Sequence, residues 1–386
     1  MATALYFLLS TLLFIACGYS LFTLYAAWRF FQQGATVSNS FPPVSIFKPL
    51  KGAPSDLYDN LASFCRLDYP EFQVLCGVRD PDDPAVAIVE RLQRDFPTME
   101  IQLVVKPEQM GSNAKVSTLH RLAQEAKYDI FVISDGDVRV EPDYLRRIVP
   151  PLCESNVGVV TCLYRGRARS PLPSLLESLI INSTFSPQVI VASQVEATTY
   201  AFGATIGITR TCLASIGGFA AIADYLADDY FLGYLATQAG YRAVIVPCVV
   251  ETNPGVATMQ ELFHHQVRWA RTQRNRRPGG YFGTVITYGT VWSFVGFLVF
   301  CSSPFICALS ITTVTLRVLS VGIVGGRYLR SVLTRTFLWL IPVIDLFSFL
   351  IWCVSVRGSS VRWGNGVFRV YPDGTMERID DVSSAT

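Results

Sequence analysis

The chain has 386 residues, of which 51% are hydrophobic and 16% are charged, and its formal net charge is +2. A mean hydropathy of +0.35 is too high for an ordinary soluble enzyme, whereas the charged content is too high for membrane-spanning helices alone. We therefore expect a soluble part and a membrane-embedded part. The near-neutral charge and the short basic runs exclude nucleic acid as an expected partner, so lipids and small molecules rank higher.

The ten cysteines and three histidines show no zinc-binding spacing. No CxxC pair occurs, and His120, His264 and His265 do not lie at the intervals from cysteine or aspartate that a zinc site needs. The cysteines are therefore predicted to be reduced and buried, in a protein that faces the cytosol.

Residues 3–28 are apolar and uncharged, and at about 1.5 Å per residue a helix of this length spans a bilayer. A cleaved signal peptide would begin with a basic residue and have a shorter apolar core. Here the first basic residue, Arg29, follows the apolar segment. The sequence therefore predicts a retained transmembrane helix, and the positive-inside rule places the next segment in the cytosol.

Residues 44–280 alternate β-rich segments with polar helical segments, a pattern typical of a doubly wound, Rossmann-like α/β domain with a parallel sheet. Such sheets bind ligands at the carboxyl ends of their strands. Asp80, Asp135 and Asp137 fall at predicted strand ends, so we expect them at the binding edge. The predicted strands read VSIFKPL, FQVLCGVRD, IQLVVK, DIFVISDGD and VGVVTCLY.

Two further apolar regions are expected at or in the membrane. Residues 172–208 are interrupted by Pro187 and by polar residues, which favours an interfacial or re-entrant segment over a span. Residues 282–356 have the length and apolar character of three transmembrane helices, with one break near Ser302. Arg317 opposes this count, since a charge at mid-bilayer costs at least about 2.5 kcal/mol.

The loop between the last two of these helices contains Arg327, Arg330 and Arg335, which places it in the cytosol. The tail, residues 357–386, carries the turn signals GNG and PDG between alternating residues. These signals predict a small β-hairpin, whose side of the membrane stays open.

The sequence SDGD presents Asp135 and Asp137 at the end of an apolar strand. Two carboxylates separated by one small residue can hold a hard divalent cation, which neutralises a diphosphate leaving group. A solvated Asp-Gly turn is the alternative, and the apolar strand that leads directly into the pair favours the metal site.

Three other polar residues are candidates for a nucleotide-dependent reaction. Asp80 could accept hydrogen bonds from a uracil or a ribose. Lys115 lies where a predicted helix begins and could face a phosphate, although a solvated surface lysine explains it almost as well. Asp229 could deprotonate an acceptor hydroxyl, whereas Asp228 or Asp229 could instead cap the helix that follows.

A cluster of aromatic and basic residues, HQVRW, runs from His265 to Trp269. Arg268 can pair bidentately with a diphosphate, and Trp269 offers a flat wall for a sugar or for a neighbouring helix. The alternative is that these residues gather at a membrane interface without a catalytic role.

The chain resembles the ceramide glucosyltransferases in the order of Asp80, Asp135, Asp229 and the HxxRW cluster, with one apolar segment before them and several after. The resemblance extends over nearly the whole chain, in the stretches KPLKG, LDYPEFQVLCGVRDPDDPA, SDGDVRV, GGF, ADDYFLG and VRWGNGVFRV. It implies an A-type, Rossmann-like nucleotide-diphospho-sugar transferase domain on the cytosolic face. The implied reaction is an inverting transfer of a sugar, glucose first, from a UDP-sugar to a lipid hydroxyl such as that of ceramide, with Mg²⁺ or Mn²⁺.

The resemblance also implies roles for single residues. Asp229 would be the catalytic base, and Asp135 and Asp137 would hold the metal. The expected donor-binding residues are Asp80, Lys115, Asp135, His265, Arg268 and Trp269. The family motif usually has Gln or Arg where this sequence has His265, so the role of that residue stays open.

Two features resemble bacterial members of the family more closely, namely the intact DxD and the stretch AFGATI at 201–206. They are similar to transferases that accompany hopanoid synthesis, which adds N-acetylglucosamine and a hopanoid polyol as an alternative sugar and acceptor. The expected location is a bacterial inner membrane, or a Golgi-type membrane in a eukaryote.

Two other protein classes compete with a lipid glycosyltransferase. A processive polysaccharide synthase shares the order Asp, Asp, Asp, RW, but it needs a membrane conduit for which three C-terminal spans are too few. A transporter or receptor would place polar groups inside its spans, where this sequence has Arg317 and Asp345 as its clear charges. Both are less favoured.

Overall fold

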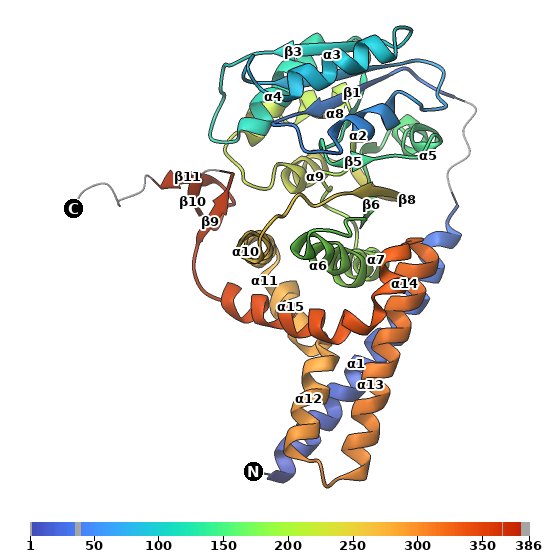
Figure 1. Cartoon of the computed structure of the whole chain (residues 1–386), viewed down its shortest axis with the longest axis vertical. Helices are drawn as coiled ribbons and strands as arrows, with labels where there is room; N and C mark the ends of the chain where they lie inside the picture. Colours follow the sequence, from blue (N-terminus) through green and yellow to red (C-terminus); the bar gives the residue numbers. More distant parts are fainter. Residues whose placement is uncertain (1, 35–39, 365, 380–386) are drawn as a thin grey trace, which may run out of the picture.

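A computed structural model describes residues 2–34, 40–364 and 366–379 of the chain. Figure 1 shows three parts: an α/β body, a group of long helices below it, and a small sheet at the side. The N-terminus lies at the end of the long helices that is farthest from the body.

The α/β body is built on an eight-stranded sheet with the order β3-β2-β1-β4-β7-β6-β8-β5. The first four strands in this order are parallel, and β6 is parallel to β8. The five strands predicted from β-rich segments are present as β1, β2, β3, β4 and β6. The strands span Val44–Pro49 (β1), Phe72–Val78 (β2), Ile101–Val105 (β3), Ile130–Ile133 (β4), Val138–Arg139 (β5), Val157–Gly166 (β6), Ile206–Thr209 (β7) and Arg242–Thr252 (β8).

The sheet is mixed, so the prediction of a wholly parallel sheet is wrong. Strand β7 runs antiparallel to β4 and β6, and β5 runs antiparallel to β8. The chain leaves β6 at its carboxyl end, passes through helices below the sheet, and re-enters at that edge as β7. Because exit and entry share one edge, β7 runs in the opposite direction, whereas a parallel strand would need a crossover to the far edge.

Helices cover both faces of the sheet, because alternate residues of each strand point to opposite faces. On one face Val44 and Ile46 of β1 pack in a core with α2, α3 and α5. On the other face Phe47 stacks on Phe131 of β4, with ring centroids 4.9 Å apart, in a core with α4, α8 and α9. These helices span Leu57–Phe64 (α2), Ala85–Asp95 (α3), Ala114–Glu125 (α4), Tyr144–Ile148 (α5), Arg210–Ser215 (α8) and Asp228–Gln238 (α9), with 3₁₀ turns at Pro150–Cys153 (η1) and Phe219–Ile222 (η3).

The segment after β6 forms α6 (Leu172–Ile180), a π-helical turn (Ile181–Phe185, η2) and α7 (Ser186–Val195) without a break. The π turn precedes Pro187, whose ring and missing N–H disturb the regular hydrogen-bond ladder. Figure 1 shows α6 and α7 between the sheet and the long helices. Residues 172–195 have the length and hydropathy of a span, but 67% of the most apolar stretch is buried within the protein.

Helices α1 (Ala2–Gln32), α12 (Gly289–Val299) and α13 (Pro304–Ile323) run alongside one another below the body (Figure 1). Small residues permit their contact. A Cβ atom at Gly289 would come within 2.7 Å of Ala16 in α1 and within 2.8 Å of Thr313 in α13. The break predicted near Ser302 is present as the turn between α12 and α13.

Four helices in the described part of the chain are long and apolar enough to cross a membrane, or five if the bent pair Pro278–Thr287 and Gly289–Val299 is one span. One of the four includes α15 (Ile341–Ser355), which in Figure 1 runs across the upper ends of α12 and α13 rather than alongside them. The Arg317 guanidinium in α13 forms an ion pair with Asp345 in α15, with Nη2 2.7 Å from Oδ1. Because the Asp345 carboxylate balances its charge, Arg317 can lie within a span at a lower cost than an isolated arginine.

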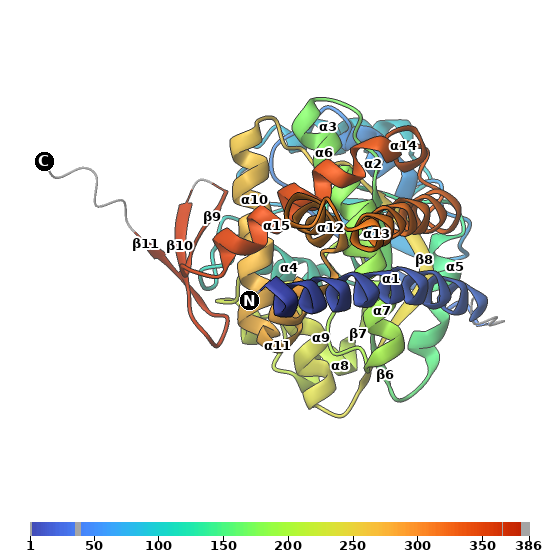
Figure 2. The ribbon, with the colours of Figure 1, turned by 90° about the horizontal axis from the view of Figure 1, so that it is seen from below.

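The C-terminal segment forms an antiparallel sheet of β9 (Ser360–Trp363), β10 (Gly366–Val370) and β11 (Met376–Ile379). The predicted hairpin is thus present with one additional strand, while residues 365 and 380–386 lie outside the described residues. Figure 2 shows this sheet at one side of the molecule, next to α10. The remaining elements are Met259–Arg276 (α10), Pro278–Gly283 (α11), Thr284–Thr287 (η4), Val324–Tyr328 (η5), Val332–Thr336 (α14) and Leu338–Leu340 (η6).

Arginines of α10 hold the small sheet in place. Arg274 donates to the carbonyl of Ser355 at 2.6 Å and to that of Gly358 at 2.7 Å, and Arg276 donates to the carbonyl of Pro372. The backbone N–H of Met376 donates to a carbonyl of the α/β body at 2.8 Å. The tail therefore lies on the same side of the long helices as the α/β body.

Candidate active site

One cavity of about 1580 Å³ extends from the α/β body to the helices below it. We call its two walls the sheet side and the helix side. The sheet side is lined by polar residues that follow the strands, namely Asp80, Lys115, Asp135, Asp137, Asp228 and Asp229. The helix side is lined by Ile180, Ile181, Phe185, Tyr281, Tyr288 and Trp352. The cavity also contacts His265, Arg268 and Trp269 of α10, so the structure brings all predicted site residues together.

Asp135 and Asp137 reach the cavity directly after β4. The loop is anchored by Lys48 of β1, whose side chain is fully buried. The Lys48 Nζ donates to the Ser134 Oγ at 3.2 Å and to the Asp135 carbonyl at 2.6 Å. Burial lowers the pKa of Lys48 to about 7, and the nearby carboxylates of Asp135 and Asp137 act in the opposite direction. A hydrogen-bonded lysine behind the loop therefore fixes where both carboxylates are presented.

Lys115 connects two groups of carboxylates. Asn113 caps α4 by accepting from the backbone N–H of Lys115 at 3.0 Å, which confirms that a helix begins here. The Lys115 Nζ lies 2.7 Å from the Asp135 Oδ1 and 3.3 Å from the Asp228 Oδ2. Burial alone would lower the pKa of Lys115, but the carboxylates around it outweigh burial and raise the pKa. Lys115 is therefore a charged member of the site and not a solvated surface lysine.

Asp137 is held by the end of β8. The Thr252 Oγ1 donates to the Asp137 Oδ2 at 2.5 Å. Burial, followed by the charge of Asp135, raises the pKa of Asp137. The side chain is thus fixed from behind, while its neighbour Asp135 is fixed by Lys115 from the opposite side.

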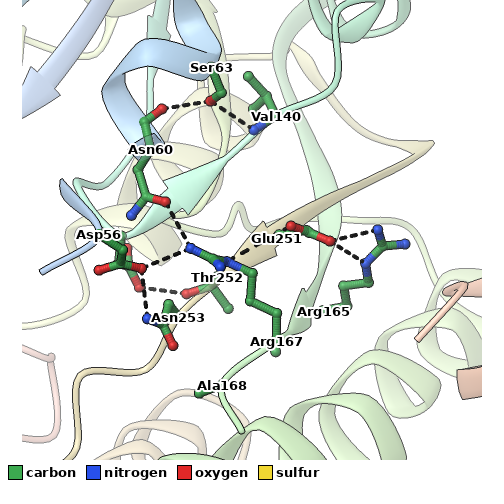
Figure 3. Close-up of polar contacts among 12 residues, drawn as sticks. Asp56, Asn60, Ser63, Val140, Arg165, Arg167, Ala168, Glu251, Thr252 and Asn253 are labelled. Carbon is green, nitrogen blue, oxygen red and sulfur yellow. Dashed lines mark hydrogen bonds and ion pairs between the residues drawn. The ribbon is translucent and has the colours of Figure 1, made fainter. Parts of the chain in front are cut away.

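Ion pairs hold the ends of β6 and β8 next to this bond (Figure 3). The Arg165 Nη2 lies 2.8 Å from the Glu251 Oε1, and the Arg167 Nη2 lies 2.9 Å from the Asp56 Oδ2. The Asn253 Nδ2 donates to the same Asp56 oxygen at 2.7 Å. Because Glu251 and Asn253 flank Thr252, these contacts fix the residue that holds Asp137.

Asp229 lies in the first turn of α9. Its Oδ2 accepts from the backbone N–H of Gly203 at 2.9 Å, and its Oδ1 accepts from that of Tyr230 at 2.8 Å. Burial, followed by the charge of Asp228, raises the pKa of Asp229 to about 6, although Lys115 acts in the opposite direction. Asp229 is therefore ionised at neutral pH, with a pKa close to the range that suits a general base. Asp228, by contrast, is engaged with Lys115.

Asp80 lies at the exposed rim of the cavity and accepts from the backbone N–H of Asp82 at 3.0 Å. Asp83 has a structural role at this turn. Its Oδ1 accepts from the backbone N–H of Gly52 at 2.9 Å and from that of Ala85 at 2.8 Å. The turn is thereby fixed, and the carboxylate of Asp80 remains accessible.

His265, Arg268 and Trp269 follow the helical spacing of one face of α10. The His265 Nδ1 lies 2.6 Å from the Oε1 of the buried Glu177, and the His265 ring lies 4.6 Å from that of Trp269. In the described part of the chain no hydrogen bond or ion pair engages the Arg268 guanidinium. Burial lowers the pKa of Arg268, and the charges of Asp229 and then Glu177 oppose that effect. Arg268 is thus a cation that is available to an anionic ligand.

The helix side has an aromatic wall whose polar groups form hydrogen bonds within the protein. The Tyr281 Oη donates to the Trp352 carbonyl at 2.7 Å, and the Trp352 Nε1 donates to the Tyr281 carbonyl at 3.0 Å. Phe185 of the π turn lies 6.3 Å from the Trp269 ring. Because its polar atoms are already bonded, this wall offers an apolar surface to a ligand.

The sequence profile of glycosyl transferase family 21 matches residues 8–376. This chain belongs to glycosyl transferase family 21. Ceramide glucosyltransferase 1 of Caenorhabditis elegans is 25% identical over 240 residues, which is 62% of this chain and 51% of the relative. A ceramide glucosyltransferase of Gibberella zeae is 35% identical over 128 residues, or 30% of this chain and 24% of the relative. The chain thus spans about half the length of its relative in C. elegans.

A solved structure shares the fold of this family 21 member. The mannosyltransferase PcManGT of Pyrobaculum calidifontis, in complex with GDP-Man and Mn²⁺, matches with a TM-score of 0.54 and 19% identity. The match covers 92% of this chain and 97% of the mannosyltransferase. At this identity the likeness shows the fold alone, and it confirms the predicted A-type, Rossmann-like transferase fold.

Three residues that line or support this family 21 cavity were not singled out from the sequence. Lys48 had a detectable signal, because a lysine inside the apolar strand VSIFKPL needs a buried partner. Glu177 had a similar signal as the single acid in the apolar stretch LPSLLESLII. Thr252 had none, because a threonine at a strand end is common and its partner Asp137 is far away in the chain.

Proposed function

We propose that this chain is a membrane-bound inverting glycosyltransferase that transfers a sugar, with glucose as the first candidate, from a UDP-sugar to a lipid hydroxyl. One observation carries the proposal: a single cavity combines a charged wall at the carboxyl edge of the sheet with an aromatic wall between apolar helices. A nucleotide diphosphate fits the first wall and a lipid fits the second. Both substrates would therefore meet in one cavity.

The donor would lie along the sheet side. Asp80 at the rim would accept hydrogen bonds from the uracil or the ribose. Lys115 and Arg268 would face the diphosphate. Among the described residues no ion pair or hydrogen bond engages the Arg268 guanidinium, and such a group can bind phosphate bidentately. Trp269 would provide a flat wall for the sugar.

The donor set of Asp135 and Asp137 fits Mg²⁺ or Mn²⁺, since both offer hard carboxylate oxygens. Within the described residues no group of three or more His, Cys, Asp or Glu is placed to hold a metal, so diphosphate oxygens and water would complete the coordination. A Cβ atom at Gly203 would come within 2.8 Å of the Asp135 Oδ2, so only glycine leaves space beside this oxygen. When bound, the cation would neutralise charge on the leaving diphosphate.

Asp229 would act as the general base. It would take the proton of the lipid hydroxyl while that oxygen bonds to the anomeric carbon from the face opposite the diphosphate. The bond to the diphosphate would break, its electron pair would leave with UDP, and the anomeric configuration would invert. Three contacts support this choice over Asp228: Asp229 accepts from the backbone N–H groups of Gly203 and Tyr230, whereas Asp228 is engaged with Lys115.

We place α1, α12 and α13 across a membrane and the α/β body in the cytosol. Arg29 lies at the body end of α1, and the basic residues Arg327, Arg330 and Arg335 follow α13 at the same end, which fits the positive-inside rule. Helix α15 would lie in the interface, because it runs across the other helices. This arrangement has two spans after the catalytic domain, one fewer than the sequence predicts. The membrane would be a bacterial inner membrane, or a Golgi-type membrane in a eukaryote.

The experiment is mass analysis of lipid products from membranes that contain the chain, supplied with UDP-glucose, UDP-galactose or UDP-N-acetylglucosamine. Ceramide and a hopanoid polyol would each be offered as acceptor. A lipid that gains one sugar with inverted configuration supports the proposal, and the productive pair identifies sugar and acceptor. A ladder of longer products would indicate a processive synthase, and the absence of any glycolipid with every pair would reject the proposal.

A further inference from the structure

We infer that Glu177 of α6 provides a second contact point for the lipid acceptor. Its carboxylate would accept a hydrogen bond from a hydroxyl or amide N–H that neighbours the glycosylated hydroxyl. The inference rests on the proposed function, because it requires a lipid in the cavity. It concerns how the acceptor is recognised and not how the sugar is transferred.

The two carboxylate oxygens of Glu177 differ in their surroundings. The side chain is fully buried, and the residue lines the cavity. Its Oε1 accepts from the Gln266 Nε2 at 3.2 Å and lies 2.6 Å from the His265 Nδ1. Its Oε2 is buried and has no hydrogen-bond partner among the residues that the structure describes. Because a buried carboxylate oxygen without a donor is costly, this atom marks a position where a ligand donor would be stabilised.

The free oxygen is held in a fixed position. His265 and Gln266 both bind the other oxygen of Glu177, and the His265 ring packs against Trp269. The hydrogen bond from Gln266 and the close contact with His265 thus hold the Glu177 carboxylate from one side. His265, whose role the sequence left open, is therefore a positioning residue in this scheme.

Glu177 also lies close to the transfer site. Glu177 contacts His265, which lies one helical turn before Arg268 in α10, and both Glu177 and Arg268 line the same cavity as Asp229. On the other side of Glu177, the same helical segment continues with Ile180 and Ile181 into the apolar wall. Glu177 is thus the polar residue at the junction between the proposed base and the apolar wall.

The charge of Glu177 selects the kind of ligand. A carboxylate repels a diphosphate, so the nucleotide is not its partner. The adjacent apolar wall favours the uncharged head group of a lipid that carries hydrogen-bond donors. A ceramide supplies an amide N–H and a second hydroxyl, and a hopanoid polyol supplies neighbouring hydroxyls. The shared chemistry is a second donor next to the reacting hydroxyl.

The test is Glu177→Gln in the full chain, assayed with ceramide and with a hopanoid polyol. The glutamine carbonyl can still accept from His265 and Gln266, but an NH₂ group replaces the free oxygen. We expect the KM for the productive acceptor to rise about tenfold while the KM for the UDP-sugar stays unchanged. Glu90→Gln is the matched control, because Glu90 lies in α3, is exposed and does not line the cavity. The control should change neither value.

A second arm uses acceptors that lack the second donor, an N-methylated ceramide or a polyol without the neighbouring hydroxyl. The unsubstituted enzyme should prefer the intact acceptor about tenfold in kcat/KM, and Glu177→Gln should lose this preference. An unsubstituted enzyme without the preference, or a variant that keeps it, overturns the inference. A changed donor KM or sugar preference would place Glu177 at the sugar and overturn it as well. If the unsubstituted enzyme glycosylates no lipid, the proposed function itself fails, which is a distinct result.

Discussion

The two sides of the cavity are organised in opposite ways. On the sheet side the carboxylates already have partners: Lys115 lies 2.7 Å from Asp135, and Thr252 donates to Asp137 at 2.5 Å. On the helix side the wall is aromatic, and one oxygen of the buried Glu177 carboxylate has no hydrogen-bond partner in the described parts of the chain.

This difference follows from what each side would bind. A charged diphosphate is stabilised best by dipoles and charges that are already oriented, because no reorganisation is needed during the reaction. A lipid binds through apolar contact area, and a few polar groups set its orientation. Substitutions on the sheet side should therefore change turnover or donor binding, whereas substitutions on the helix side should change acceptor binding.

Metal removal should have the largest effect, because Lys115 and Arg268 alone would then face the negative charges of Asp135, Asp137 and the diphosphate. Excess chelator should abolish turnover and also weaken UDP binding measured by calorimetry, and Mn²⁺ or Mg²⁺ should restore both. Full turnover in excess chelator would show that Lys115 and Arg268 neutralise the diphosphate without a metal ion.

Asp229→Asn tests the junction between the two sides. Loss of a general base typically lowers the rate by about 10² to 10⁴, and UDP affinity should be retained because the base contacts the acceptor. Asp80→Asn is the matched variant and should weaken UDP binding itself. If Asp229→Asn keeps more than about a tenth of the turnover, the base is a different residue and Asp228 is the next one to substitute.

The pH dependence should follow the pKa of about 6 that burial and Asp228 give Asp229. A base must be deprotonated to act, so activity is full above this pKa and falls as acid protonates the carboxylate. We expect kcat/KM to decrease about tenfold per pH unit below the pKa of Asp229. A profile that stays flat down to pH values near the usual aspartate pKa of about 4 would contradict a raised pKa at this base.

Trp352→Leu tests the helix side alone. Removing the indole deletes contact area and the bond from its Nε1 to the Tyr281 carbonyl, so the acceptor KM should rise about tenfold with the donor KM unchanged. Trp339→Leu is the control, because Trp339 is 70% exposed and does not line the cavity. Equal effects of both substitutions would indicate a general loss of stability.

Thiol labelling tests whether the long helices next to the helix side cross the membrane as proposed. This test is expected to have no effect on activity. Cys153 in the α/β body and Cys301 in the turn between α12 and α13 are both exposed, and that turn lies at the N-terminal end of the long helices (Figure 1). In variants that keep one of these cysteines, an impermeant reagent should label Cys301 on intact cells and Cys153 only after lysis. Labelling of Cys153 from outside would invert the proposed topology.

Local patterns were sufficient for much of this protein. Alternation of β-rich and polar segments predicted five strands, and the strand that ends in SDGD placed Asp135 and Asp137 at the ligand edge. The N-terminal helix and the break near Ser302 were also predicted. These features depend on neighbouring residues, whose periodicity and turn preferences act over a few positions.

Contacts between distant segments decided the rest. The antiparallel direction of β7 depends on where the preceding helices return the chain, and the transverse course of α15 depends on its packing and on the Arg317–Asp345 pair. The contacts of Lys115 with Asp135 and of His265 with Glu177 likewise join residues that the sequence keeps far apart. A side chain's charge and polarity are properties of its sequence position, but its partner and its burial are set only when the tertiary structure brings the distant segments together.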